Sequence, residues 1–248
     1  MEKPLIEACV DSYESCRAAF SGGADRFELC GQLAIGGVTP SPALFEQVKR
    51  DFSVKINVLI RPRGGDFLYS DKEIEQICEE IRLFKKLGAD GVVIGALNAD
   101  GSLDEKNMRR FIGLAGGMHV TLHRAFDKTR DAFDALEIAV SLGVNTVLTS
   151  GQMPSAPEGA PLLKEIRERA QGRLSIMAGG GVRADNIRSL HEQTGITVFH
   201  TSCRKRVKSG MKFLRGEVST GLTSFPEDEI FITDEAEFRL CAEVVHSL

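Results

Sequence analysis

The stretch LGADGVVIG, residues 87–95, ends an amphipathic segment with a glycine and passes within a few residues into a short apolar run. Glycine is common just after a helix, and short runs of β-branched residues are typical of buried strands. The same junction recurs in three other stretches, which are GGADRFEL (22–29), LGVNTVLTSG (142–151) and TGITVFH (194–200). The chain is therefore predicted to repeat a unit in which a helix leads into a strand.

Apolar runs of this kind follow one another along the 248 residues, with room between neighbours for one helix and its loops. This pattern predicts an α/β protein, a single (β/α)8 TIM barrel in one domain over residues 1–248, with the barrel core at about 4–202. Residues from about 203 to 248 are predicted to form an extended C-terminal tail with a terminal helix, since Asp234 is a suitable N-cap and Glu237 follows three residues later. The predicted strands end near Val10, Cys30, Ile60, Ile94, His123, Leu148, Ala178 and His200.

The composition excludes several classes of protein. A net charge of −4 lacks the basic excess that favours nucleic-acid binding, so we expect no nucleic-acid partner. No apolar run approaches the ~18 residues of a membrane span, and the segment MEKPLIEACV lacks the apolar core of a signal peptide. We therefore expect no membrane partner and a cytoplasmic protein whose six cysteines are free thiols.

Strand periodicity predicts which side chains face the barrel interior. Alternate residues of a strand point to opposite faces, and the apolar set of each run packs against the helices. The other set holds charges, and an unpaired buried charge loses several kcal/mol of hydration, so these charges are expected to pair. The side chains predicted to face inward are Glu7, Cys9, Glu28, Cys30, Asn57, Arg61 and His123.

Two interpretations of this polar interior stay open. In the first, Glu7, Glu28 and Arg61 neutralise one another and only hold the strands together. In the second, the same network orients other side chains around a ligand, and we favour it because these groups lie where ligands bind in such barrels. The side chains so oriented would be His123, Asp127 and His200.

Two loops that follow predicted strands carry residues suited to binding or acid–base chemistry. The motif RPRGGDF presents Arg61 or Arg63 to a carboxylate or phosphate, unless pairing with its own aspartate pins the loop. The motif HRAFD contains His123, whose near-neutral pKa suits general acid–base catalysis if Asp127 or Glu28 sets its tautomer.

The loops after the last two strands offer an anion site. Backbone N–H groups at Gly179, Gly180 and Gly181, together with Ser202, could hold a phosphate as in other barrels of this class, although a tight turn also explains the glycines. The basic stretch RKRVK, residues 204–208, is predicted to be a solvated loop, with a supplementary anion clamp as the less favoured alternative.

Cys9 and Cys30 share the inward parity near the ends of consecutive strands, so their sulfurs are predicted to approach one another. Two thiolates in a low-coordinate arrangement suit Cu(I), whereas a free buried cysteine is more often a small hydrophobic residue. A shared metal requires sulfurs no more than about 4.6 Å apart, because two bonds of about 2.3 Å span that distance.

Motifs along most of the chain carry a resemblance to a known family, and they are ACVDS, GGADRFELC, GGVTPS, RPRGGDFLYSDKEI, GADGVVIGAL, HRAFD, VLTSG, AGGGV, FHTS and SGMKF. In these motifs the chain resembles the CutC family of copper-homeostasis proteins. This resemblance implies a TIM barrel, a cytoplasmic location, homo-oligomers and Cu(I) binding through the cysteines that are Cys9 and Cys30 here. Cys203 stands where a small residue is expected, and is either an incidental thiol or an extra ligand.

Two functions follow from these observations. In the first, the protein is CutC-like and binds copper, as Cu(I), through Cys9 and Cys30 at the barrel mouth, with a dimer or tetramer as the expected homo-oligomer. In the second, it is an enzyme that acts on a small anionic or phosphorylated substrate by acid–base chemistry. The residues that would carry this second function are Glu28, Arg61, His123, Asp127 and His200, with Arg63, Gly179, Gly180, Gly181 and Ser202 binding the anion.

Overall fold

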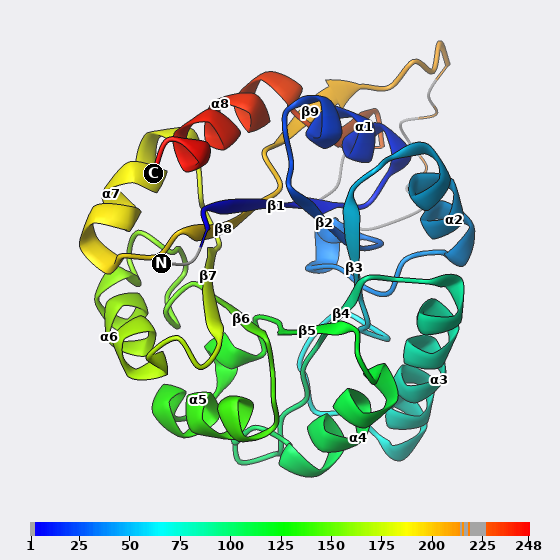
Figure 1. Ribbon diagram of the computed structural model, residues 1–248. Coiled ribbons are helices and arrows are strands. Elements are labelled where there is room, and N and C mark those ends of the chain that lie inside the picture. The colour runs from blue at the N-terminus through cyan, green and yellow to red at the C-terminus, as the bar shows by residue number, and fades with distance from the viewer. Residues whose placement is uncertain (1–2, 214, 216–217, 219–226) are drawn as a thin grey trace.

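The computed structural model describes residues 3–213, 215, 218 and 227–248. Within these residues eight parallel strands, each hydrogen-bonded to its two neighbours, form a closed barrel, and helices surround it (Figure 1). The predicted TIM barrel is therefore confirmed. The strands are β1 (Leu5–Val10), β2 (Arg26–Leu29), β3 (Lys55–Leu59), β4 (Gly91–Ile94), β5 (His119–Leu122), β6 (Thr146–Thr149), β7 (Ser175–Gly179) and β8 (Val198–Thr201).

The helices on the outside alternate with the strands along the chain. They are α1 (Tyr13–Ser21), α2 (Pro42–Asp51), α3 (Asp71–Leu87), α4 (Glu105–Ala115), α5 (Ala132–Ser141), α6 (Ala160–Ala170), α7 (Ala184–Thr194) and α8 (Glu235–His246). Short 3₁₀ turns, η1 (Leu33–Ile35) and η2 (Phe126–Lys128), lie in the loops after β2 and β5. Among the helices so described, none combines the length and apolarity needed to cross a bilayer.

Helix α3 illustrates how local sequence sets these boundaries. The Ser70 hydroxyl accepts a hydrogen bond from the Glu73 N–H, and the Glu73 carboxylate accepts one from the Ser70 N–H. Two backbone N–H groups at the start of the helix thus have hydrogen-bond acceptors. Gly88 ends the helix with φ 85°, in the left-handed region that glycine adopts without strain. Between these caps one face is buried against the barrel, through Ile74, Ile77, Cys78, Ile81 and Phe84.

The main core lies between the barrel wall and the ring of helices. Ile6, Ala8 and Val10 of β1 all belong to it and are fully buried, and the apolar residues of the other strands join them. A separate small cluster faces the interior, and it is made of Cys9, Cys30, Leu59 and Val93. The predicted division of each strand into two faces is thus visible in how the side chains cluster.

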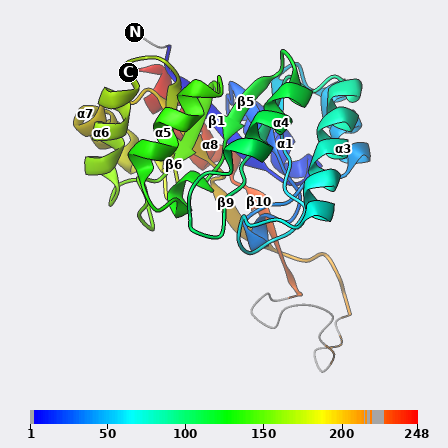
Figure 2. The same cartoon turned by 90° about the horizontal axis from the view of Figure 1, so that it is seen from below.

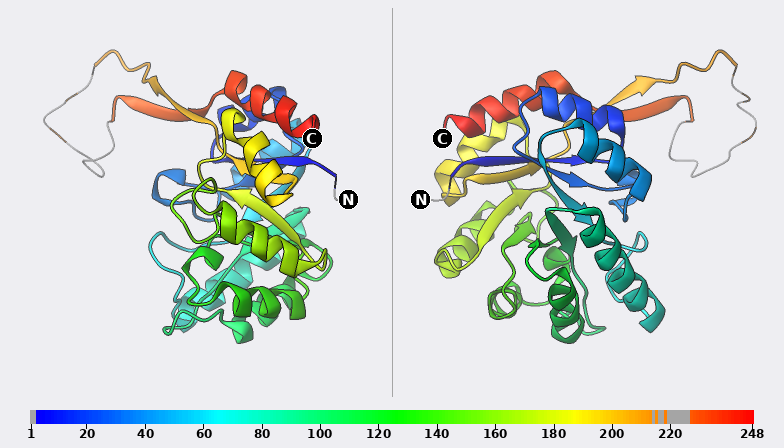
Figure 3. Two further views of the ribbon diagram at one scale, coloured as in Figure 1. Left: turned by 90° about the vertical axis from the view of Figure 1, so that its left-hand side faces the viewer. Right: turned by 45° about the vertical axis from the view of Figure 1, so that its right-hand side comes forward.

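The tail after β8 contains a hairpin and a helix. The basic stretch predicted to be a solvated loop is instead strand β9 (Arg204–Lys208), which pairs antiparallel with β10 (Glu229–Thr233) in a two-stranded sheet. Lys208 Nζ lies 2.8 Å from a carboxylate oxygen of Asp228, so facing acids neutralise the basic strand. The hairpin projects from one end of the barrel (Figures 2 and 3).

The terminal helix α8 begins where the sequence predicts. The Asp234 carboxylate accepts hydrogen bonds from the N–H groups of Ala236 and Glu237. The helix packs against α7 on one side and α1 on the other, and so closes the outer ring (Figure 1). The boundary predicted near residue 202 therefore falls within the eighth strand–helix unit, and the division of the chain into domains stays a prediction.

Candidate metal centre

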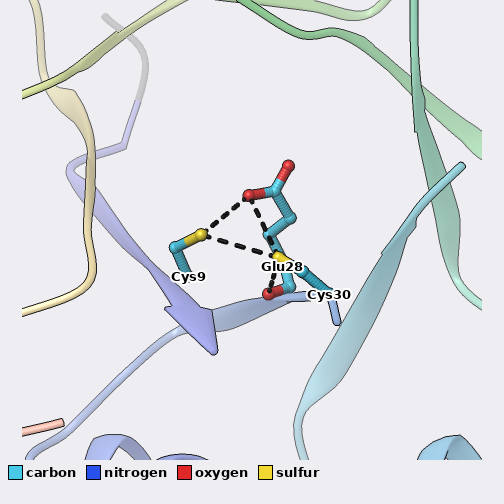
Figure 4. Close-up of side chains that lie close together, drawn as sticks. All are labelled: Cys9, Glu28 and Cys30. Atoms are coloured by element: carbon cyan, nitrogen blue, oxygen red, sulfur yellow. Dashed lines mark hydrogen bonds between the residues drawn. The ribbon is translucent and has the colours of Figure 1, made fainter. Parts of the chain in front are cut away.

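Two thiols and a carboxylate meet inside the barrel where β1 and β2 end (Figure 4). The strand register places Cys9 opposite Glu28, and Cys30 directly follows β2. The Cys9 Sγ and Cys30 Sγ atoms are 3.6 Å apart, within the 4.6 Å limit set above. Glu28 Oε2 lies 3.1 Å from Cys9 Sγ and 3.8 Å from Cys30 Sγ. All three side chains are more than nine-tenths buried.

These three donor atoms fit a single cation. The distances between them define a triangle whose corners lie about 2.0 Å from a common centre, close to metal–oxygen bonds of about 2.0–2.2 Å and metal–sulfur bonds of about 2.3 Å. With such bonds the S–metal–S angle is about 100°, so the arrangement suits three or four ligands rather than a linear pair. Cys9, Glu28 and Cys30 can therefore hold a metal ion without backbone movement.

Burial and neighbouring groups keep both thiols protonated in the metal-free protein. The hydrogen bond with Cys30, together with burial, raises the pKa of Cys9 well above its usual value. Burial raises the pKa of Cys30 to about 12. A metal that binds here must displace these protons, because thiolate is the ligating form.

A network of charged side chains lies next to this centre in the barrel interior. Glu7 of β1 forms a buried salt bridge with Arg26 and accepts a 2.9 Å hydrogen bond from Nδ1 of His200. Burial opposes the ionised carboxyl of Glu7, but Arg26 and His200 outweigh it and lower its pKa to about 2. The Asn57 amide donates a further hydrogen bond to Glu7 at 3.4 Å.

His200 links this network to the thiol cluster. Its Nε2 atom lies 3.4 Å from Glu28 Oε2, while Nδ1 contacts Glu7. Burial disfavours the imidazolium, but the Glu28 carboxylate and the hydrogen bond to Glu7 outweigh it and raise the pKa of His200 well above its usual value. Burial also raises the pKa of the Glu28 carboxyl, against the opposing effect of His200. The imidazolium thus orients and partly neutralises the carboxylate that contacts the thiols.

Arg61, the expected partner of Glu7 and Glu28, instead contacts loop residues. Its guanidinium donates to the carbonyls of Gly37 at 3.0 Å and Gly65 at 2.6 Å, and it stacks on Phe67 with 4.8 Å from Cζ to the ring centroid. The predicted network of Glu7, Glu28 and Arg61 is therefore wrong in its cation, because Arg26 and His200 provide the positive charge. Arg61 ties two loops together at the barrel mouth.

His123 does not have the carboxylate partner that acid–base catalysis requires. Its Nδ1 accepts a 3.1 Å hydrogen bond from the Ala125 N–H, and among the described residues no partner reaches its buried Nε2. Burial lowers the pKa of His123 to about 3, so the ring is neutral. The expectation that Asp127 or Glu28 sets its tautomer is wrong.

Asp127 and Arg63 are occupied by other contacts. Asp127 accepts hydrogen bonds from the Thr149 hydroxyl at 2.5 Å and from the Ser150 N–H, which fixes the loop after β6. Arg63 pairs with Glu73 at 2.6 Å and with Asp66 at 3.0 Å, so internal pairing pins the RPRGGDF loop. Neither side chain lines the cavity at the barrel mouth.

A cavity of about 310 Å³ occupies the mouth, at the C-terminal ends of the strands. Gly179 lies outside its lining, although the two glycines that follow it contribute. Arg26 is a further functional residue, absent from the predicted set of inward-facing side chains, although it has the same strand parity as Glu28. The predicted site residues that line this cavity are Cys9, Glu28, Cys30, Arg61, His123, Gly180, Gly181, His200 and Ser202.

A larger cavity of about 1330 Å³ opens at the opposite end of the barrel, where the strands begin. Arg26, His119 and Ser175 are among its lining residues. The thiol cluster borders the smaller cavity and not this one. Because strand C-termini form the binding face in such barrels, the smaller cavity is the candidate site.

Known proteins resemble this chain over most of its length. A family model described as CutC family matches residues 4–205. The copper homeostasis protein cutC homolog of Homo sapiens is 46% identical over 236 residues, which are 95% of this chain and 86% of that protein. A family protein CutC of Bacteroides fragilis strain YCH46 is 46% identical over 224 residues, 90% of this chain and 89% of its own.

Solved structures give the same result. The crystal structure of a copper homeostasis protein CutC from Streptococcus agalactiae has a TM-score of 0.77 and 29% identity, and covers 80% of this chain and 98% of that one. A structure titled QR15, an aldolase, has a TM-score of 0.61 at 16% identity, a likeness of fold alone.

Proposed function

This chain belongs to the CutC family, and from that premise we propose that it binds Cu(I) as its cargo, between Cys9 and Cys30 at the barrel mouth. Glu28 is the third donor in this proposal. Relatives of this chain are named copper homeostasis proteins, and we infer the same role for this protein.

One observation carries the proposal. The two sulfurs and Glu28 Oε2 surround a point at metal-bonding distance, and all three residues are buried. Soft thiolates select Cu(I) or Zn²⁺ over hard cations such as Mg²⁺ and Ca²⁺. The relatives' names favour copper between these two metals.

The acid–base enzyme stays the weaker alternative. His123 is neutral and lacks a carboxylate partner, while Arg63 and Asp127 are engaged in loop contacts. Acid–base chemistry at this mouth would need a carboxylate beside His123 and would need Arg63 and Asp127 to be free, whereas metal binding needs only Cys9, Cys30 and Glu28.

The remaining parts of the proposal concern location and assembly. We place the protein in the cytoplasm, because a reducing compartment keeps thiol pairs such as Cys9 and Cys30 available for a metal. We also propose a homo-oligomer, a dimer or tetramer. Exposed apolar side chains follow β9 on the projecting hairpin, where Met211 is 64% and Phe213 68% exposed, and such side chains suit a protein contact.

An anaerobic titration with Cu(I) against a competing chelator tests the metal site. Replacing Cys9→Ser and Cys30→Ser together is expected to remove the high-affinity ion bound at the mouth. Cys78→Ser is the matched control, because Cys78 is equally buried but lies in α3, away from the cluster. Unchanged affinity and stoichiometry in the double variant would exclude these residues as ligands.

A further inference from the structure

A second group of soft donors lies at the start of the tail. Cys203 follows β8, whereas Glu237 and Cys241 lie on α8 four residues apart, and thus on the same face of the helix. The Sγ atoms of Cys203 and Cys241 are 3.6 Å apart, the same distance as in the first cluster. One donor atom from each of the three residues lies within 4.8 Å of the others.

Backbone contacts fix the two parts of this group against each other. The Asp234 N–H donates a 2.8 Å hydrogen bond to the Cys203 carbonyl, and the Asp234 carboxylate caps α8. The loop that carries one sulfur is therefore tied to the first turn of the helix that carries the other. Metal ligands need this kind of fixed placement, since the entropy of ordering them is already lost on folding.

Cys203 also has a backbone conformation that its residue type disfavours. Its φ of 42° lies in the left-handed region, where a non-glycine residue is strained by about 1 kcal/mol or more. Glycine would occupy this position without strain. A cysteine that only fills space in the core does not require this strained backbone conformation. The strain therefore favours a role for the Cys203 sulfur itself.

The two thiols are buried and reduced, with Cys203 2% and Cys241 0% exposed. Cys203 also lines the mouth cavity, which gives an ion a route to the pair.

We propose that Cys203, Glu237 and Cys241 form a second metal site, which takes a thiophilic closed-shell cation, Cu(I) or Zn²⁺. Sulfurs 3.6 Å apart give an S–metal–S angle of about 100° with bonds of about 2.3 Å, as expected for three or four ligands. The carboxylate is the third donor, and the cavity side leaves a position open. This site uses no residue of the first cluster, so it does not depend on copper binding there.

Metal stoichiometry in four proteins tests this proposal. The wild type, the Cys9→Ser/Cys30→Ser variant, the Cys203→Ser/Cys241→Ser variant and the Cys78→Ser control are titrated anaerobically, with Cu(I) and separately with Zn²⁺, each against a chromophoric chelator. If Cu(I) or Zn²⁺ occupies the second site, the Cys203→Ser/Cys241→Ser variant is expected to bind one equivalent less of that cation than the wild type binds. Stoichiometry equal to the wild type for both metals would overturn the proposal.

A spectroscopic measurement guards against a folding defect in that variant. In the Cys9→Ser/Cys30→Ser protein the second thiol pair is intact, and X-ray absorption of the bound metal is expected to show sulfur neighbours at about 2.3 Å. Nitrogen and oxygen neighbours alone would contradict the second site. A metal lost only in the Cys9→Ser/Cys30→Ser protein would support the first site and not the second, so the two proposals fail separately.

Discussion

Cys9, Glu28 and Cys30 show what strand parity can establish for single residues. Parity alone predicts that their side chains face the barrel interior. The observed strand register places Cys9 opposite Glu28, and the Sγ atoms of Cys9 and Cys30 are 3.6 Å apart. Arg61 and His123 also line the mouth cavity, as parity predicts, but their hydrogen-bond partners differ from the expected ones. Beyond a strand end the side-chain direction depends on the loop, whose carbonyls and rings the sequence pattern does not locate.

Protonation of the thiols gives a prediction at this scale. Both Cys9 and Cys30 have raised pKa values, so at neutral pH each must lose a proton when Cu(I) binds. The mouth site is expected to release about two protons per ion, and its apparent affinity should rise about 100-fold per pH unit while both thiols remain protonated. A pH indicator in weakly buffered protein, lacking Cys203 and Cys241 thiols, would measure the release.

The direction of this pH dependence is fixed by the ligands' protonation. A rise in pH removes the protons that compete with the metal, so affinity falls only on acidification. Affinity independent of pH between 6 and 8 would mean that the thiols are already ionised, contrary to their burial.

At the scale of elements, short apolar runs spaced by room for one helix predict the ends of all eight barrel strands to within about one residue. A glycine-terminated helix marks the start of four of these strands, β2, β4, β6 and β8. The tail was harder to predict. A basic run reads as solvated in isolation, and its pairing with β10 depends on acids some twenty residues further on, such as Asp228. The role of α8 in the helix ring likewise follows from packing against α1 and α7 rather than from its own pattern.

A pair of substitutions on α8 tests whether this helix is part of the barrel's core. Phe238 is fully buried, whereas Leu240 on the same helix is 52% exposed. Phe238→Ala is expected to lower the free energy of unfolding by about 3–5 kcal/mol, because it leaves a cavity in a packed core. Leu240→Ala should change it by less than about 0.5 kcal/mol. Urea unfolding measures both, and equal effects would show that α8 is not part of the cooperative core.

At the scale of the whole molecule, the barrel and the hairpin have different surfaces. The barrel buries its apolar residues between strands and helices, whereas the hairpin extends away from it (Figure 3). Met211 and Phe213, which follow β9, are exposed. The expectation of a homo-oligomer rests on family resemblance alone, since single exposed apolar residues cannot be recognised in a sequence before the fold is known.

Assembly through the hairpin can be measured directly. Met211→Glu with Phe213→Glu is expected to shift the proposed dimer or tetramer towards monomer in analytical ultracentrifugation, because charges replace apolar contact area. Leu240→Glu is the control, because Leu240 is an exposed apolar residue on the outer helix α8. A double variant that sediments as the wild type does would exclude the hairpin from the subunit contact.

Helix α8 packs beside β1, so the final helix of the chain and its first strand lie next to each other (Figures 1 and 3). Every strand of the ring has two neighbours, and β1 pairs with β8 as it does with β2. The architecture therefore has no intrinsic beginning. A short peptide that joined the two ends would permit new termini in another surface loop, such as the one after α4, and such a circular permutant would keep the same strand neighbours and the same donor atoms.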